Sequence, residues 1–385
     1  MPTLSPEKAQ ALAAYAEIAV PLPVGGPFTY HIPPDLQPLV KIGARVRIPF
    51  KNREMTAYVT LLTANPALEE SQLSKLKSIS SVLDEKPVLS ANILALTKQI
   101  SLYYGCTWGE AIENALPKWV KFGKNAGAKS VAADGPAPDF SAPSVDLTLS
   151  VSQKTAFEKI RANLETSSPK PVLLHGVTGS GKSELYIRAI REVLQKGESA
   201  ICLVPEIALT EQLRRFFICH FGPNLEILHS KLSDGERFSA WQRLQKGERQ
   251  VVLGPRSAVF APVSRLGLII MDEEHENSYK QETTPRYHAR EVAAWRASGE
   301  HALFIMGSAT PSLETMRRAQ TGEIELLRLP TRIDEKSMPE VQVVDLKELA
   351  GPRKKGFFSA KLLAEIEINL KKKEGTILLL NRRGF

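Results

Sequence analysis

The chain contains an eight-residue stretch with the glycine spacing of a phosphate-binding loop. It reads GVTGSGKS and comprises Gly176, Val177, Thr178, Gly179, Ser180, Gly181, Lys182 and Ser183. Glycines allow backbone N–H groups to turn inward onto a phosphate, and the positive end of a following helix adds to this attraction. The pattern predicts that Lys182 reaches the β- and γ-phosphates of ATP and that Ser183 ligates Mg²⁺. The alternative is a plain glycine turn, but the strand-like PVLLH before it and the helical SELYIRAIREVLQ after it favour the phosphate loop.

An acidic cluster follows the apolar run LGLIIM later in the chain. It consists of Asp272, Glu273 and Glu274, and His275 comes next. A carboxylate at the carboxyl end of a parallel strand points into the crevice where ligands bind. We therefore expect Asp272 to hold Mg²⁺ and Glu273 to orient or polarise the attacking water. The alternative, solvated charges at a strand end, is disfavoured by the phosphate-loop pattern in the same chain, whereas His275 alone is typical of an ordinary loop histidine.

A third stretch, MGSATPS, places hydroxyl groups after another apolar run. Ser308, Ala309 and Thr310 lie at its centre, and their two hydroxyls are suited to sensing the state of a neighbouring nucleotide site. Ser312 is also predicted to cap the next helix, and the two interpretations are compatible.

The composition is that of a globular protein with a basic surplus. The 385 residues carry a formal net charge of +8, which suits a polyanionic partner without establishing one. The three cysteines are far apart and indicate neither a disulfide framework nor a zinc site. No apolar run approaches the length of a membrane span, and the N-terminus lacks the basic start of a signal peptide, so we expect a cytoplasmic protein.

The elements expected to position these residues fall into two patterns. Near the N-terminus, EIAVPLPVGGPFTYHIPP and KIGARVRIPF alternate at strand period, and SANILALTKQISLYYG is helical with Ser90 as its N-cap. From Leu147 onward, unbroken apolar runs alternate with helical periods, which indicates a parallel sheet covered on both faces. The expected fold class is therefore α/β, a P-loop lobe with a parallel sheet, preceded by a small β-rich domain.

The ordered set GSGKS, DEEH and SAT resembles that of superfamily-2 helicases. Longer phrases narrow the resemblance to the replication-restart helicases of the PriA family; they are LVPEIALTEQL (203–213), GPRSAVFAP (254–262), DEEHENSYKQ (272–281), YHAREVA (287–293), GSATPSLET (307–315) and LLLNRRGF (378–385). The resemblance covers nearly the whole chain. It implies an N-terminal DNA-binding domain over 1–122, a flexible linker over 123–145, a recA-like helicase lobe over 146–335 and the start of a truncated second lobe over 336–385.

The activity that the resemblance implies is that of an ATP-dependent 3′-to-5′ DNA helicase of replication restart. Such an enzyme recognises stalled forks and initiates primosome assembly. The implied cofactors are ATP and Mg²⁺. The implied partners are forked and single-stranded DNA, other primosome proteins, single-stranded DNA-binding protein and the replicative helicase loader; a monomer without membrane attachment is expected.

Further site residues follow from the resemblance alone. Gln153 occupies the place of an adenine-reading glutamine, although an exposed residue at a helix start is the alternative. Phe28, Tyr30 and Lys77 match a pocket that recognises the 3′ end of a nascent strand. Arg256 lies where the family contacts the DNA backbone.

The sequence departs from the family pattern in several places. Thr29 replaces an aspartate that helps to recognise the 3′ end. The linker is too short for the family's winged-helix domain. The zinc module, the rest of the second lobe and its arginine finger would lie beyond Phe385, so this chain has no zinc ligands and is expected to hydrolyse ATP poorly.

Two other function classes remain open at this point. The first is a fork-DNA binding module without motor activity, because the second lobe is missing. The second is a P-loop kinase or other NTPase with a small-molecule substrate, against which the SAT stretch after DEEH and the N-terminal domain both argue.

Overall fold

The computed structural model describes residues 13–118, 148–333, 340–346 and 358–379. The chain divides into two compact units, Met1–Asp334 and Glu335–Phe385. The predicted linker over 123–145 lies outside the described residues, and the predicted domain boundaries therefore stay predictions. No helix within the described ranges is long and apolar enough to cross a membrane.

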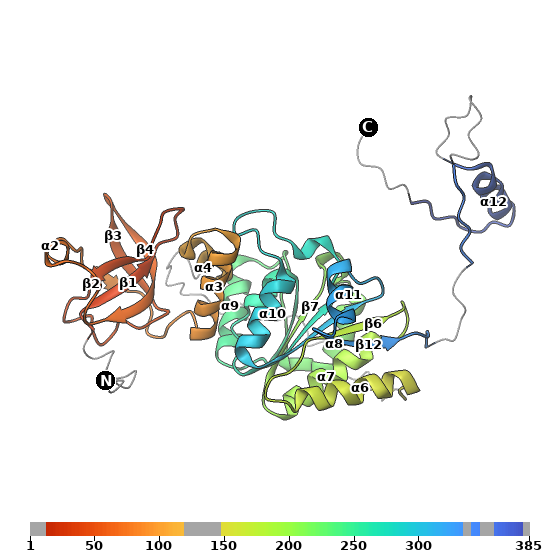
Figure 1. Cartoon of the computed structure of the whole chain (residues 1–385), viewed down its shortest axis with the longest axis horizontal. Coiled ribbons are helices and arrows are strands. Elements are labelled where there is room, and N and C mark those ends of the chain that lie inside the picture. The colour runs from red at the N-terminus through yellow and green to blue at the C-terminus, as the bar shows by residue number, and fades with distance from the viewer. Residues whose placement is uncertain (1–12, 119–147, 334–339, 347–357, 380–385) are drawn as a thin grey trace, which may run out of the picture. The chain divides into compact units, whose positions relative to one another are not determined.

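The first unit begins with an antiparallel sheet of five strands in the order β2-β1-β4-β3-β5 (Figure 1). The strands are β1 (Tyr15–Ala19), β2 (Phe28–His31), β3 (Arg45–Phe50), β4 (Arg53–Thr63) and β5 (Ser81–Val82), and a short helix α2 (Glu70–Leu73) precedes β5. Alternate residues such as Ile18, Val46 and Val59 are buried in its core. The β-rich N-terminal domain predicted from the alternation is confirmed.

Two helices, α3 (Ala91–Tyr104) and α4 (Trp108–Ala115), follow this sheet. Ser90 caps α3 as predicted, because its hydroxyl accepts a hydrogen bond from the backbone N–H of Ile93. Their apolar residues belong to the same buried cluster as helix α10 (Ala289–Glu300) of the following lobe. The two helices therefore share a hydrophobic core with the lobe.

The lobe is built on a parallel sheet of seven strands in the order β12-β6-β11-β10-β7-β9-β8. The strands are β6 (Val172–Gly176), β7 (Ser199–Leu203), β8 (Leu225–Ile227), β9 (Val251–Gly254), β10 (Leu266–Asp272), β11 (Leu303–Ser308) and β12 (Glu325–Leu329). Besides α10, its main helices are α6 (Val151–Leu164), α7 (Lys182–Gln195), α8 (Glu211–Phe221), α9 (Asp234–Gln245) and α11 (Leu313–Gln320). It also contains short 3₁₀ helices, which are η1 (Glu206–Ala208), η2 (Gly222–Asn224), η3 (Arg256–Phe260) and η4 (Asn277–Tyr279).

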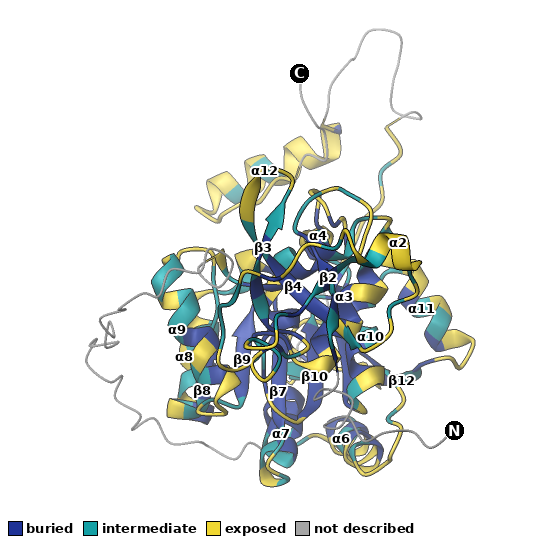
Figure 2. Cartoon of the chain, turned by 90° about the vertical axis from the view of Figure 1, so that its left-hand side faces the viewer, coloured by how far each residue is buried: buried dark blue, intermediate teal, exposed yellow. Residues whose placement is uncertain are grey.

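Helices cover both faces of this sheet, as the unbroken apolar runs predict. Leu268 and Ile270 of β10 pack with α6, α7 and α8, whereas Ile269 and Met271 pack with α9, α10 and η3 on the other face. Because successive strand residues point to opposite faces, both sets are buried, and the sheet is dark blue through its centre in Figure 2. The α/β fold class is thus confirmed.

The second unit contains the helix α12 (Ala360–Lys371). Ser359 caps it by accepting a hydrogen bond from the N–H of Leu362. None of the residues of α12 is buried within its own unit or elsewhere in the described chain. The prediction that 336–385 begins a second lobe is not tested by this single helix.

Candidate nucleotide site and nucleic-acid surface

The glycine-rich stretch forms the turn between β6 and α7, so it lies at the carboxyl edge of the parallel sheet. Gly179 and Gly181 have φ angles of +80° and +79°, a left-handed conformation that favours glycine. A side chain on Gly176 would also lie 2.5 Å from the Ser180 hydroxyl. The three glycines of the motif are therefore required by the local backbone.

The loop presents several hydrogen-bond donors that suit an anion. Gly181 precedes α7 and provides no side-chain cap, so the first amides of α7 have no side-chain acceptor there. The Lys182 ammonium donates a 2.8 Å hydrogen bond to the Gly176 carbonyl, within the loop itself. The Ser180 hydroxyl is buried and has no hydrogen-bond partner among the described residues. A bound phosphate would satisfy these donors, and a nucleotide therefore fits the residues present.

Asp272 ends β10 and lies beside the loop. Its carboxylate accepts a 2.9 Å hydrogen bond from the hydroxyl of Tyr186, which belongs to α7. Gly307 of β11 is paired with Asp272, and a side chain at Gly307 would lie 1.6 Å from that same hydroxyl. The absence of a side chain at Gly307 thus allows α7 to reach the acid.

The charge of Lys182 acts on both Asp272 and Glu273. Burial raises the pKa of Asp272, while the Tyr186 hydrogen bond and the Lys182 charge act in the opposite direction. Burial and the neighbouring Asp272 raise the pKa of Glu273, and Lys182 again opposes the change. Lys182 therefore lies within interaction range of both carboxylates, as the sequence motifs predict.

The segment after Asp272 connects these acids to the SAT stretch. The His275 ring accepts or donates a 2.8 Å hydrogen bond with Ser308, which is fully buried, and lies 3.5 Å from the Thr310 hydroxyl. The Ser308 hydroxyl also accepts from the backbone N–H of Thr310. Ser312 caps α11 as predicted. His275 is therefore the link between the acids and the SAT hydroxyls rather than an ordinary loop histidine.

We expect the buried charge of Asp272 to destabilise the protein when no nucleotide is bound. Its pKa is raised in the folded state, so the penalty is present above that pKa and is lost as the pH falls toward the ordinary value of 3.8. Asp272→Asn should therefore raise the free energy of unfolding near pH 7, with little gain near pH 4. Urea unfolding at the two pH values measures this, and an equal gain at both would contradict it.

Gln153 is buried, with 4% of its surface exposed, and not an exposed residue at a helix start. Its amide nitrogen donates to the Ser180 carbonyl of the phosphate loop at 3.0 Å. Its amide oxygen accepts from the Ser150 N–H at the start of α6. The structure thus places Gln153 against the phosphate loop, while its reading of adenine stays a prediction.

One neighbour of the loop was not anticipated from the sequence. The segment 329–333, which follows β12, lies along the phosphate loop. Val177 donates to the Leu329 carbonyl, and Ile333 donates to the Gly179 carbonyl at 3.0 Å. The Arg332 guanidinium lies within 4 Å of the position that a side chain on Gly179 would take. No local motif signals this contact, because it depends on the tertiary path of the chain.

The predicted DNA-binding residues of the N-terminal domain lie around the turn between β3 and β4. Phe28 packs edge-on against Phe50, with ring centroids 5.4 Å apart. The Tyr30 hydroxyl donates to the Pro49 carbonyl, although the ring itself is buried. Lys77 donates to the Lys51 carbonyl and is exposed. The structure therefore brings Phe28, Tyr30 and Lys77 to one turn, and their contact with DNA stays a prediction.

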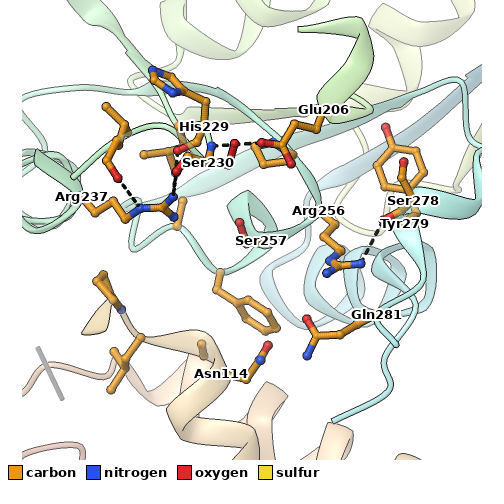
Figure 3. Close-up of a pocket in the computed structure, with 18 of the residues that line it drawn as sticks. Asn114, Glu206, His229, Ser230, Arg237, Arg256, Ser257, Ser278, Tyr279 and Gln281 are labelled. Atoms are coloured by element: carbon orange, nitrogen blue, oxygen red, sulfur yellow. Dashed lines mark hydrogen bonds between the residues drawn. The ribbon is translucent and has the colours of Figure 1, made fainter. Parts of the chain in front are cut away.

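A cavity of about 940 Å³ lies at the carboxyl ends of β7, β8 and β9. Arg256 lines it and donates to the carbonyls of Ser278 and Lys280. Asn114 of α4 lies on the wall opposite His229 and Ser230 (Figure 3). The residues of the phosphate loop do not line this cavity, so it is separate from the nucleotide site. Its walls come from the lobe and from the end of α4 with the residues that follow it.

Two domain families match the chain. Residues 17–117 match the PriA 3′ DNA-binding domain, and residues 150–319 match the DEAD/DEAH box helicase domain. The Treponema pallidum replication restart protein PriA is 35% identical over 97% of this chain and 55% of its own length. The Bacillus subtilis replication restart protein PriA is 48% identical over 62% of this chain and 30% of its own length.

The chain spans about half the length of the curated relatives that it matches over nearly its whole length. Among solved structures, that of RecG bound to a three-way DNA junction is 23% identical over 52% of this chain and 26% of that chain, with a TM-score of 0.36. The domain matches coincide with the N-terminal sheet and helices and with the parallel-sheet lobe.

Proposed function

The chain belongs to the family of PriA replication restart proteins, and we propose that it recognises stalled replication forks and uses ATP to translocate 3′ to 5′ on DNA. A helicase-type ATPase domain that uses nucleotide and Mg²⁺ is general to this family. The initiation of primosome assembly, the 3′-to-5′ direction and the cytoplasmic location are the finer parts of the proposal. A fork-DNA binding module without motor activity is the competing function.

The observation that carries the proposal is the placement of Asp272 and Glu273 within range of the Lys182 charge at the phosphate loop. There Lys182 would neutralise charge on the β- and γ-phosphates, and Ser183 and Asp272 would hold the Mg²⁺ ion. Mg²⁺ supplies electrostatic stabilisation of the transferring phosphoryl group when it is bound. Glu273 orients the attacking water, and burial together with the neighbouring Asp272 raises the pKa of its carboxyl group, which makes it a better proton acceptor.

His275 couples ATP hydrolysis to movement along DNA in this proposal. Loss of the γ-phosphate changes the charge that Glu273 faces, and His275 lies 3.7 Å from Glu273 while contacting Ser308. A rearrangement at the acids is thereby passed to the SAT stretch. Differential affinity for nucleotide in two arrangements of the lobes then moves the strand.

The cavity between the lobe and α4 is the proposed path of the single strand. Four basic residues and three acidic residues line it, and the basic ones could contact phosphates, which positions a strand without reading its bases; the basic residues are Lys118, Arg237, Arg256 and Lys280, and the acidic ones are Glu206, Asp234 and Glu282. The turn with Phe28, Tyr30 and Lys77 is the proposed site of the nascent 3′ end, where Thr29 stands in place of the family acid. Primosome proteins, single-stranded DNA-binding protein and the replicative helicase loader are the proposed protein partners.

The test is whether forked DNA stimulates ATP hydrolysis by the chain. We expect forked DNA to stimulate the low basal turnover at least about tenfold, since part of the proposed strand path is formed by residues that follow strands β7, β8 and β9 of the lobe that holds the nucleotide site. Binding of forked DNA with no turnover would support the binding module instead. If forked DNA neither binds nor stimulates hydrolysis, the result would favour an NTPase with a small-molecule substrate.

A further inference from the structure

The third acid of the cluster, Glu274, has different surroundings from Asp272 and Glu273. It is 1% exposed, and its side chain contacts residues of α10 and of α11 with its N-cap. One carboxylate oxygen accepts a 2.7 Å hydrogen bond from the backbone N–H of Ser312, and the other accepts from the hydroxyls of Ser312 and Thr315. Arg290 of α10 donates to the same oxygen at 3.1 Å. Glu274 therefore joins the acidic segment to the starts of two helices.

Arg290 completes a closed network around this carboxylate. Its guanidinium also donates to the Ser312 hydroxyl at 2.7 Å and to the Thr315 hydroxyl at 3.1 Å. The Arg290 side chain is 13% exposed and that of Glu274 is 0% exposed. Moving Arg290 or Glu274 out of this network would leave the other charge buried without a partner, which is costly. The network is therefore expected to keep the arrangement seen here.

The residue before Glu274 has a strained backbone. Glu273 has a φ angle of +46°, in the left-handed region that residues with side chains rarely adopt. A residue keeps such a strained conformation only where contacts with the surrounding structure hold it in place. Here the N–H of Glu274 donates to the Gly307 carbonyl, and the N–H of Glu276 donates to the Glu273 carbonyl. The side-chain network of Glu274 fixes the same segment from the other side.

We propose that Glu274 is a positioning residue that holds Glu273 in its left-handed conformation and so directs the Glu273 carboxylate at the attacking water. This inference rests on the proposed role of Glu273 in ATP hydrolysis. It also makes α11, the helix directly after the SAT stretch, a second connection between the acids and that stretch, in addition to His275. Glu274 touches neither nucleotide nor water in this account.

The experiment compares Glu274→Gln with a matched control in the same chain. Glutamine keeps the size of the side chain but removes its charge. The control is Glu300→Gln, because Glu300 forms a similarly buried pair with Arg296 on α10, with side chains 9% and 2% exposed. Two readouts are taken for each variant: hydrogen exchange of residues 273–276 and 308–316, and the hydrolysis of MgATP with forked DNA alongside the binding of a fluorescent ATP analogue.

For Glu274→Gln we expect exchange in both segments to be at least about tenfold faster, kcat to fall about tenfold and nucleotide affinity to stay within about twofold. For Glu300→Gln we expect both segments and kcat to be unchanged. Unchanged exchange at 273–276, or a kcat loss equal in the two variants, would overturn the proposal. If the unmodified chain shows no turnover, the proposed function fails, and the exchange data still decide whether Glu274 holds the segment.

Discussion

Lys182→Ala is expected to abolish ATP turnover while leaving the binding of forked DNA largely intact. Lys182 lies within interaction range of Asp272 and Glu273 and begins helix α7 at the phosphate loop. Removal of one such preorganised donor lowers turnover by about 10²–10³-fold or more. The cavity proposed as the path of the single strand is lined by other residues, so fork affinity should change by less than about threefold. Steady-state hydrolysis and fluorescence anisotropy with forked DNA measure the two quantities.

A matched control lies at the other end of the same helix. Lys196 follows the last residue of α7 and forms an ion pair with Glu165. Lys196→Ala removes the same charge from the chain but leaves the phosphate loop unchanged, and turnover should stay within about twofold. Equal turnover in Lys182→Ala and the unmodified chain would refute the assignment of the nucleotide site.

Gly307→Ala is expected to lower both the stability of the protein and its ATP hydrolysis. The added carbon would lie 1.6 Å from the Tyr186 hydroxyl and 3.3 Å from a carboxylate oxygen of Asp272. Tyr186 is 2% exposed and lies in the core between α7 and the sheet, so it is closely surrounded. Overpacking of this kind costs about 1–3 kcal/mol, and it also separates the Tyr186 hydroxyl from Asp272. Denaturant unfolding and ATP hydrolysis should both show the loss.

The cause can be isolated with a second substitution. Tyr186→Phe removes the hydroxyl that the new methyl group meets, so the double variant Gly307→Ala with Tyr186→Phe should recover most of the lost stability. The interaction free energy from the double-mutant cycle should be at least about 1 kcal/mol. Additive losses would show that Gly307 is required for another reason.

The nucleotide motifs could be predicted from the sequence because their chemistry is local. A phosphate loop between a strand and a helix, and acids at the end of an apolar strand, need no knowledge of distant residues. The parallel sheet then follows, since its strands are buried on both faces and read as unbroken apolar runs. Once both motifs lie at carboxyl ends of strands in one parallel sheet, their proximity is a consequence of the topology.

Tyr186 could not be assigned from the sequence. A tyrosine on the apolar face of an amphipathic helix is indistinguishable from an ordinary core residue. Its hydrogen bond to Asp272 depends on the register of β10 with β11, which places a glycine beside the acid.

The proposed role of Glu274 could not be predicted from the sequence for a similar reason. In a row of three acids, nothing local distinguishes the residue that faces Arg290 and α11 from the two that face the phosphate loop. The wall that α4 contributes to the cavity likewise depends on how two domains pack. These are tertiary features, and periodicity carries no information about them.

The most direct test of the proposed nucleotide site is a crystal structure of the chain with Mg²⁺ and a non-hydrolysable ATP analogue. We expect the triphosphate in the turn over 176–183, with the ion about 2.1 Å from the Ser183 hydroxyl and held, directly or through one water, by Asp272. The Glu273 carboxylate should face the γ-phosphate. A triphosphate bound elsewhere, or an ion more than about 8 Å from both carboxylates, would contradict the account.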